Sequence, residues 1–152
     1  MAKIATFRDL IAWQRAMDLA EQTHRASQSL PSTERFEMAS QLRRSATSIP
    51  ANVAEGFSRK SRAAYRSHVA IALGSNAERQ THLEVCRRLA LLVAPTVSRL
   101  EELALEVARL LYGLWRSLRP KAVGYAGALL LLFVLGLWPL ALGLFRGLSF
   151  FP

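Results

Sequence analysis

The centre of the chain carries basic side chains at spacings suited to phosphate binding. The run FSRKSRAAYR contains four cations, Arg59, Lys60, Arg62 and Arg66. On a helix, Arg62 and Arg66 are four residues apart and share a face. Phosphate contacts need mobile cations but no base-reading geometry, so this cluster predicts sequence-independent binding to RNA or DNA. The alternative is a solvated basic face without a partner.

Further arginines extend this predicted basic surface. Arg43 and Arg44 are adjacent, so on a helix they point about 100° apart and at most one lies beside any given stripe. Arg87 and Arg88 lie within reach of Glu84, which favours ordinary surface ion pairs. The residues predicted to contact nucleic acid are Arg43, Arg44, Arg59, Lys60, Arg62, Arg66, Arg79, Arg87 and Arg88.

The overall charge supports the same class of partner. The chain has 20 Lys and Arg against 11 Asp and Glu, which gives a net charge of +9. Most of the excess lies between residues 40 and 99, where ten cations face three acids. Such a surface favours polyanions, either nucleic acid or acidic lipid headgroups. Cys86 is the only cysteine, which excludes an internal disulfide and fits a protein of the cytoplasm.

No group of residues predicts catalysis. The three histidines, His24, His68 and His82, have no metal-ligand spacing, and no glycine-rich phosphate loop is present. Glu55 has no evident partner for general-base chemistry, and we expect it to accept hydrogen bonds or to pair with an arginine at a helix end. The prediction is a non-enzymatic protein with no metal and no cofactor.

Apolar periodicity and capping residues predict the elements that carry these side chains. Helices are expected over residues 7–28, 34–58, 62–93 and 96–118, with Thr6 and Ser61 as N-caps and Pro95 before the last helix. Serine and threonine side chains can accept hydrogen bonds from the free N–H groups of the first turn of a helix. No segment alternates with the period of a strand. The fold class is therefore all-α, an antiparallel up-and-down four-helix bundle formed by residues 1–120.

The second predicted helix contains the unusual stretch SQLRRSATSIPANVAEG. Its apolar residues form one stripe: Leu42, Ala46, Ile49 and Val53. Its polar residues form a second stripe: Gln41, Ser45, Ser48, Asn52 and Glu55. Pro50 removes the hydrogen bond to the Ala46 carbonyl, so a kink is expected, with hydroxyls of Ser45, Thr47 and Ser48 as replacement donors. The polar stripe faces solvent, a neighbouring helix or another subunit; all three alternatives remain open.

Long motifs in the chain resemble a known family. The runs FRDLIAWQRAMDLAEQ, SQLRRSATSIPANVAEGFSRKS, IALGSNAERQTHLEVC and ARLLYGLWRSLRP are similar to bacterial four-helix bundle proteins encoded in intervening sequences of 23S ribosomal RNA genes. That family is in turn similar to the accessory variability determinant of diversity-generating retroelements. The resemblance covers residues 6–119. It implies a helical bundle, a homo-oligomeric ring such as a pentamer, nucleic-acid association and a role beside a reverse transcriptase, but no catalytic activity.

Two features depart from the family pattern. The third helix is more polar than usual at Asn76, Arg79, Gln80 and His82. The chain also continues beyond Arg119, where family members commonly stop.

The continuation, residues 121–152, is predicted as a separate hydrophobic tail. Residues 122–145 carry no charge and are long enough to cross a bilayer as a transmembrane helix. Arg116, Arg119 and Lys121 precede the run, which predicts a cytoplasmic bundle anchored to the inner membrane. The alternatives are an interfacial hairpin bent at Pro139, packing against the bundle or an oligomer, and an extension without a selected role.

Overall fold

The chain forms four long α-helices in the computed structural model, which describes residues 4–59 and 61–120. They are α1 (Ile11–Ser27), α2 (Met38–Ser58), α3 (Arg62–Arg88) and α4 (Ala94–Ser117). Two short 3₁₀ helices, η1 (Phe7–Asp9) and η2 (Ser32–Glu34), precede α1 and α2. Over these described ranges the structure contains no strand, which confirms the all-helical fold.

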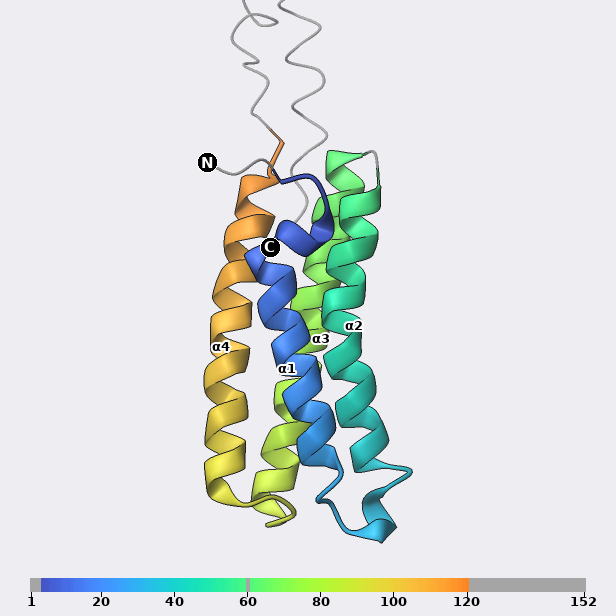
Figure 1. Cartoon of the computed structure of the whole chain (residues 1–152), viewed down its shortest axis with the longest axis vertical. Coiled ribbons are helices and arrows are strands. Elements are labelled where there is room, and N and C mark those ends of the chain that lie inside the picture. Colours follow the sequence, from blue (N-terminus) through green and yellow to red (C-terminus); the bar gives the residue numbers. More distant parts are fainter. Residues whose placement is uncertain (1–3, 60, 121–152) are drawn as a thin grey trace, which may run out of the picture. The chain divides into compact units, whose positions relative to one another are not determined.

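The helices run up and down side by side, and each packs against its neighbours in the chain (Figure 1). The most extensive contact joins α2 to α3, and α4 closes the bundle by packing against both α3 and α1. As a result, α1 and α3 begin at the same end of the bundle at which α2 and α4 terminate (Figure 1). This shared end brings the start of α3 next to the last turn of α4.

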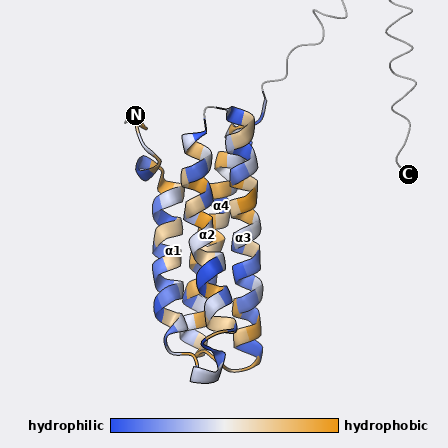
Figure 2. Ribbon diagram, turned by 90° about the vertical axis from the view of Figure 1, so that its right-hand side faces the viewer, coloured by the Kyte–Doolittle hydropathy of each residue, from blue (hydrophilic) through white to orange (hydrophobic). Residues whose placement is uncertain are grey.

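One hydrophobic core runs through the four helices. Its fully buried members include Leu19, Ile49, Val69, Leu83 and Leu111. Hydrophilic and hydrophobic residues alternate along each helix in Figure 2, as expected for helices that bury one face. Cys86 belongs to this core as a buried free thiol, and desolvation raises its pKa.

Three helix boundaries differ from the predicted ones. Thr6 and Asp9 form a reciprocal capping box, but it caps η1, and the extended backbone of Leu10 separates η1 from α1. The helix expected from residue 34 begins at Met38, because residues 32–34 form a 3₁₀ turn and Glu37 has φ −102° and ψ −94°.

The third helix ends at Arg88, not near Val93. Ala90 adopts φ 51°, in the left-handed region, and the N–H of Leu91 donates to the Cys86 carbonyl at 2.9 Å. This backbone arrangement closes a helix C-terminus whatever the following residues are. An alanine at the left-handed position gives no sequence signal, since glycine is the usual residue there.

Helix α2 continues as one α-helix through Pro50, which is buried. Ser45 donates to the carbonyls of Gln41 and Leu42, and Thr47 donates to those of Arg43 and Arg44. Neither hydroxyl donates to the Ala46 carbonyl, so the expected replacement of the missing bond by these side chains is wrong. The kink stays a prediction.

By its internal contacts, the chain up to Arg119 forms one compact unit. No helix within residues 4–59 and 61–120 is long and apolar enough to cross a membrane. The predicted transmembrane helix over residues 122–145 lies outside the described residues.

Candidate nucleic-acid interface

Arg62 joins the beginning of α3 to the end of α4. Its Nη2 donates to the carbonyl of Ser117, in the last turn of α4. The free carbonyls of a helix C-terminus carry partial negative charge and attract a cation. Within its own helix the same arginine is placed unfavourably, because it occupies the first turn of α3, where the helix dipole disfavours positive charge.

Arg66, one turn further along α3, packs on the indole of Trp115. Its guanidinium carbon lies 3.9 Å from the ring centroid, and that of Arg119 lies 5.4 Å away. Both distances are within the range of cation–π attraction. Trp115 is partly buried against the core, so this ring fixes two cations at the shared end of the bundle.

Four arginines therefore gather at this end: Arg62, Arg66, Arg116 and Arg119. We call them the basic end. Among the residues that the structure describes, no carboxylate lies within 4 Å of any of the four guanidinium groups. The acids of the adjoining elements are engaged elsewhere: Asp9 accepts from the backbone N–H groups of Ala5 and Thr6, which lowers its pKa. The basic end thus presents uncompensated positive charge.

The other members of the predicted cluster have different surroundings. Arg59 donates to Glu55 at 2.6 Å, and Nε2 of His68 lies 3.7 Å from the same carboxylate. Arg59, followed by His68, lowers the pKa of Glu55, which fits its expected role as a hydrogen-bond acceptor at a helix end. Lys60 lies outside the described residues.

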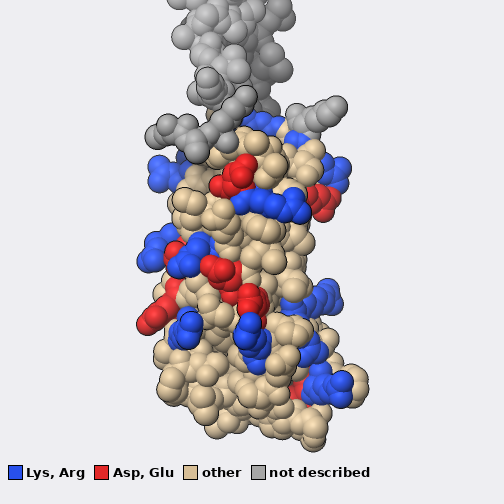
Figure 3. Space-filling view, in the orientation of Figure 1, with Lys and Arg blue, Asp and Glu red and all other residues tan. Residues whose placement is uncertain are grey.

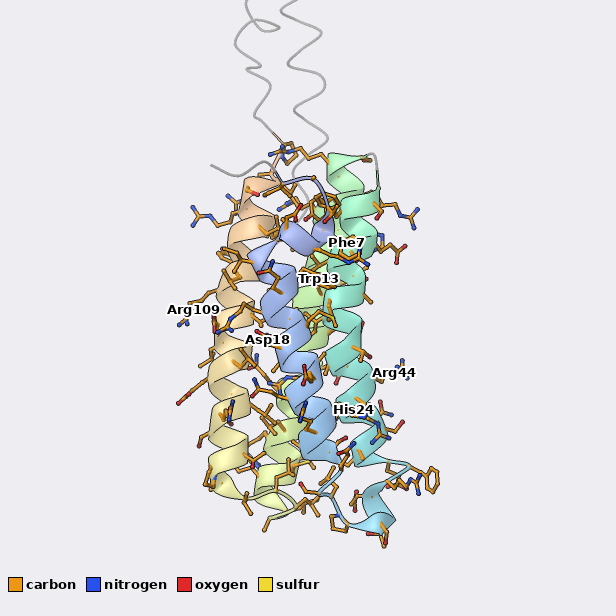
Figure 4. The ribbon with its side chains drawn as sticks, in the orientation of Figure 1. Phe7, Trp13, Asp18, His24, Arg44 and Arg109 are labelled. Carbon is orange, nitrogen blue, oxygen red and sulfur yellow. The ribbon has the colours of Figure 1, made fainter. Side chains whose placement is uncertain are left out.

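Arg43 and Arg44 point in different directions, as predicted. Arg43 donates to the Ser27 hydroxyl at 3.2 Å and is directed toward α1. Arg44 is exposed and projects away from the bundle, as does Arg109 on α4 (Figure 4). These arginines lie on separate faces and do not form one continuous surface with the basic end.

Arg87 and Arg88 are neutralised by one carboxylate at the opposite end of α3. Glu84 accepts from Nε of Arg87 at 2.6 Å and from Nε of Arg88 at 2.7 Å. These hydrogen bonds, from Arg87 first and Arg88 second, lower the pKa of Glu84 to about 2. Basic and acidic side chains also lie next to one another on the face shown in Figure 3. Between α1 and α4, Arg15 pairs with Glu106, and within α1 it pairs with Asp18. Such pairs leave little net charge for a polyanion.

The expected surface position of Arg79 is wrong. Its side chain is fully buried, with one donor, Nη2, 3.4 Å from the Leu100 carbonyl. Nε and Nη1 are buried without a partner in the described part of the chain. Asn76, one turn earlier, is also buried and donates to the Ala104 carbonyl at 3.0 Å. Desolvation lowers the pKa of Arg79 to about 10, opposed by the charge of Glu101.

The polar stripe of α2 packs largely against α3 of the same chain. The Ser48 hydroxyl lies 2.9 Å from that of Ser75, and Oδ1 of Asn52 lies 3.3 Å from Nδ1 of His68. Ser45 is buried, whereas Gln41 at the other end of the stripe is exposed. The stripe could face solvent, a neighbouring helix or another subunit, and its middle residues, Ser48 and Asn52, contact a neighbouring helix.

Gly56 permits the close approach of these two helices. A Cβ atom at this position would lie 2.7 Å from Cδ2 of Tyr65 and 2.8 Å from Cβ of His68. Distances this short exclude any side chain without movement of α3. The glycine of the A-E-G motif is therefore required by packing.

The sequence patterns identified only half of the basic end. Arg116 and Arg119 were assigned solely to the flank of the apolar tail, and Trp115 and Tyr112 were assigned no role. The signal that could have found them is their spacing on α4, since residues 112, 115, 116 and 119 share one side of a helix.

Comparison with known proteins matches the chain to one family model and to solved structures. The model of the family described as 23S rRNA-intervening sequence protein matches residues 8–113. A solved structure from Bacteroides thetaiotaomicron, a protein with unknown function from the S23 ribosomal protein family, is similar with a TM-score of 0.66 and 24% identity. The similarity covers 70% of this chain and 96% of that chain, and it supports the fold. The search of curated proteins found no match.

Proposed function

The chain belongs to the family of 23S rRNA-intervening sequence proteins, and from this premise we propose that it is a non-enzymatic protein that binds RNA or DNA through its basic end. The observation that carries the proposal is the gathering of Arg62, Arg66, Arg116 and Arg119 without a neighbouring carboxylate. Four cations held at one end of a rigid bundle suit phosphate groups, which require charge and hydrogen-bond donors but no base readout.

Helix-end effects account for only part of this arrangement. Arg116 and Arg119 are favourable at the end of α4, and Arg62 donates to the Ser117 carbonyl there, but Arg62 also occupies the first turn of α3, where the helix dipole disfavours a cation. Elsewhere on the described part of the bundle, Arg15, Arg25, Arg59, Arg87 and Arg88 pair with carboxylates, while unpaired arginines such as Arg44 and Arg99 are not gathered into one group. Unpaired cations at one end favour an external anion as their partner.

The test is binding of a labelled RNA to the purified protein at increasing salt concentration, by fluorescence anisotropy. Residues 1–119 form a compact unit with its core inside it, so a chain ending at Pro120 is a suitable second sample. We expect binding at low ionic strength that weakens by orders of magnitude as salt rises. Absence of binding at low ionic strength in both samples would contradict the proposal.

Self-association is a further part of the proposal, as a ring such as a pentamer. Several large apolar side chains are exposed on the bundle, among them Ile11, Met17 and Ile71. Native mass spectrometry measures the number of copies directly. A role as accessory to a reverse transcriptase is the narrowest form of the proposal, and its support is the sequence resemblance; a reverse-transcriptase gene beside this one would favour it.

A second candidate function is membrane association without a specific nucleic-acid role. The observation that favours it is the uncharged sequence of residues 122–145, which follows Arg116, Arg119 and Lys121. Arginine and lysine before an apolar segment of this length predict a cytoplasmic bundle held at the inner membrane. Flotation of the full chain with liposomes, compared with the chain ending at Pro120, tests it; equal flotation of both chains would contradict anchoring by the tail.

A further inference from the structure

We propose that the outer side of α4 near the basic end is a stacking platform for unpaired bases, so that the preferred ligand is single-stranded nucleic acid. This inference rests on the proposed function and specifies its ligand. The residues concerned, here called the α4 strip, are Arg109, Tyr112, Trp115, Arg116 and Arg119.

Two aromatic rings form the centre of the α4 strip. The rings of Tyr112 and Trp115 are stacked, with centroids 5.8 Å apart and an interplanar angle of 22°. Tyr112 is 50% exposed, although a ring of this size usually buries more of its surface in a folded domain. A stacked pair whose outer member is open to solvent offers a flat surface to a further ring.

The inner ring is held in place by charge. Arg66 lies 3.9 Å from the Trp115 centroid and Arg119 lies 5.4 Å from it, while the indole also packs against the core. Trp115 is thus fixed from α3 and α4 together. Tyr112 rests on this fixed ring, so a base that stacks on Tyr112 meets a surface that is already ordered.

Cations flank the exposed ring on the same helix face. Arg109 precedes Tyr112 by three residues and Arg116 follows it by four, and these spacings place all three on one side of α4. The two arginines are about 10 Å apart along the helix axis. Arg109 projects outward in Figure 4, and among the ion pairs of the described residues neither arginine takes part, although the charge of Arg109 acts on Glu106 one turn earlier. The phosphates on the two sides of a base stacked on Tyr112 could therefore bind the guanidinium groups of Arg109 and Arg116, one on each side.

Gly113 leaves the backbone beside Tyr112 uncovered. A Cβ atom there would meet nothing within 4 Å, so packing within the chain does not require a glycine. Glycine in a helix interior lowers helix stability relative to alanine. Its effect here is to widen the approach to the Tyr112 ring.

The chemistry selects single strands over duplexes. Aromatic side chains stack on the faces of bases, and these faces are covered in a duplex but open in single-stranded RNA or DNA. Cations with interleaved aromatic rings are the arrangement that binds single strands without sequence preference. Anionic lipid is the other partner with suitable charge, and the experiment below includes it.

The test compares three labelled probes with equal numbers of phosphates: a single-stranded RNA, the duplex of the same sequence, and an oligonucleotide whose residues are abasic. Anisotropy is measured with the full chain in mild nonionic detergent, and binding to phosphatidylglycerol vesicles is measured separately by flotation without detergent. Tyr112→Ala should weaken binding of the single strand roughly 5- to 100-fold, the range for one stacked base, and leave the duplex and abasic probes nearly unchanged. Tyr112→Phe keeps the ring and should keep the affinity.

Leu105→Ala is the matched control, because Leu105 is 55% exposed and lies two helical turns before Tyr112 on the same face. It should leave all three affinities unchanged. If Tyr112→Ala lowered the affinity for all three probes equally, the stacking inference would be overturned while phosphate binding stands. The same holds if Leu105→Ala lowered the affinity for the single strand as much as Tyr112→Ala does. Loss of affinity for phosphatidylglycerol vesicles without loss for the single strand would assign the α4 strip to a membrane and also overturn it. If no probe binds even at low salt, the proposed function fails as well.

Discussion

The guanidinium of Arg66 on α3 lies 3.9 Å above the Trp115 ring of α4. With the bond from Arg62 to the Ser117 carbonyl, this contact ties the start of one helix to the end of the next. The cations of the central run and those near the end of the bundle therefore form one site. Neither segment alone would present four arginines on one surface.

The close contact between α2 and α3 gives a prediction with a built-in control. Gly56→Ala should lower the free energy of unfolding by about 1 to 3 kcal/mol, because its Cβ would overlap Tyr65 and His68. Gly74→Ala should raise it by about 0.5 to 1 kcal/mol, since that Cβ meets nothing within 4 Å and alanine favours the helix. Urea unfolding followed by circular dichroism measures both. A stabilising Gly56→Ala would show that the two helices are further apart than described.

Because Arg79 is buried, we expect the free energy of unfolding to increase when its charge is removed. Desolvation lowers its pKa from the ordinary arginine value to about 10, which corresponds to a free-energy penalty of roughly 3 kcal/mol at neutral pH. The penalty is complete below the folded-state pKa and is relieved as pH rises above about 10. Arg79→Met should raise the free energy of unfolding by about 1 to 3 kcal/mol.

Arg99→Met is the control for Arg79, because Arg99 is exposed on α4. It should change stability by less than about 0.5 kcal/mol. Both variants are measured in the same urea titration at pH 7. A destabilising Arg79→Met would mean that the guanidinium contributes more through its bonds than it costs by its burial.

The Glu84 carboxylate predicts a pH-dependent contribution to stability. Arg87 and Arg88 lower its pKa from 4.5 to about 2. Because the folded-state pKa is below the unfolded one, the stabilisation is present above about pH 4.5 and is lost as pH falls toward 2. Glu84→Gln should therefore lower the urea midpoint at pH 6, and the difference from the parent should vanish near pH 2. An exposed carboxylate on α4, in Glu102→Gln, should leave the midpoint at pH 6 unchanged; a difference for Glu84→Gln that persists at pH 2 would have another cause.

Periodicity and capping residues were sufficient to predict the fold. The four helices follow from apolar residues at helical spacing, and Ser61 caps α3 by accepting from the N–H of Ala64. The boundary errors arise where backbone geometry overrides composition: at Leu10, at Glu37 and at Ala90. None of these residues is a typical breaker, so local sequence gives no signal.

The site was harder to predict than the fold. A single helical pattern shows which residues share a face, but not which face meets a neighbouring helix. For this reason Arg79 was placed with the surface arginines, although its side chain lies inside the bundle. For the same reason Arg62 and Arg66 were identified without Trp115 and Arg119, which reach them only through the packing of α3 against α4.

The salt dependence of RNA binding by two charge-matched variants tests the central claim most directly. In Arg62→Gln/Arg116→Gln/Arg119→Gln three cations of the basic end are removed, and in Arg25→Gln/Arg87→Gln/Arg88→Gln three arginines that pair with Glu21 or Glu84 are removed. Their net charges are equal. For single-stranded RNA the slope of log affinity against log salt should fall by about 2 in the first variant and by less than about 0.5 in the second. Equal reductions in both variants would show that net charge, and not the basic end, determines binding, and would contradict the account.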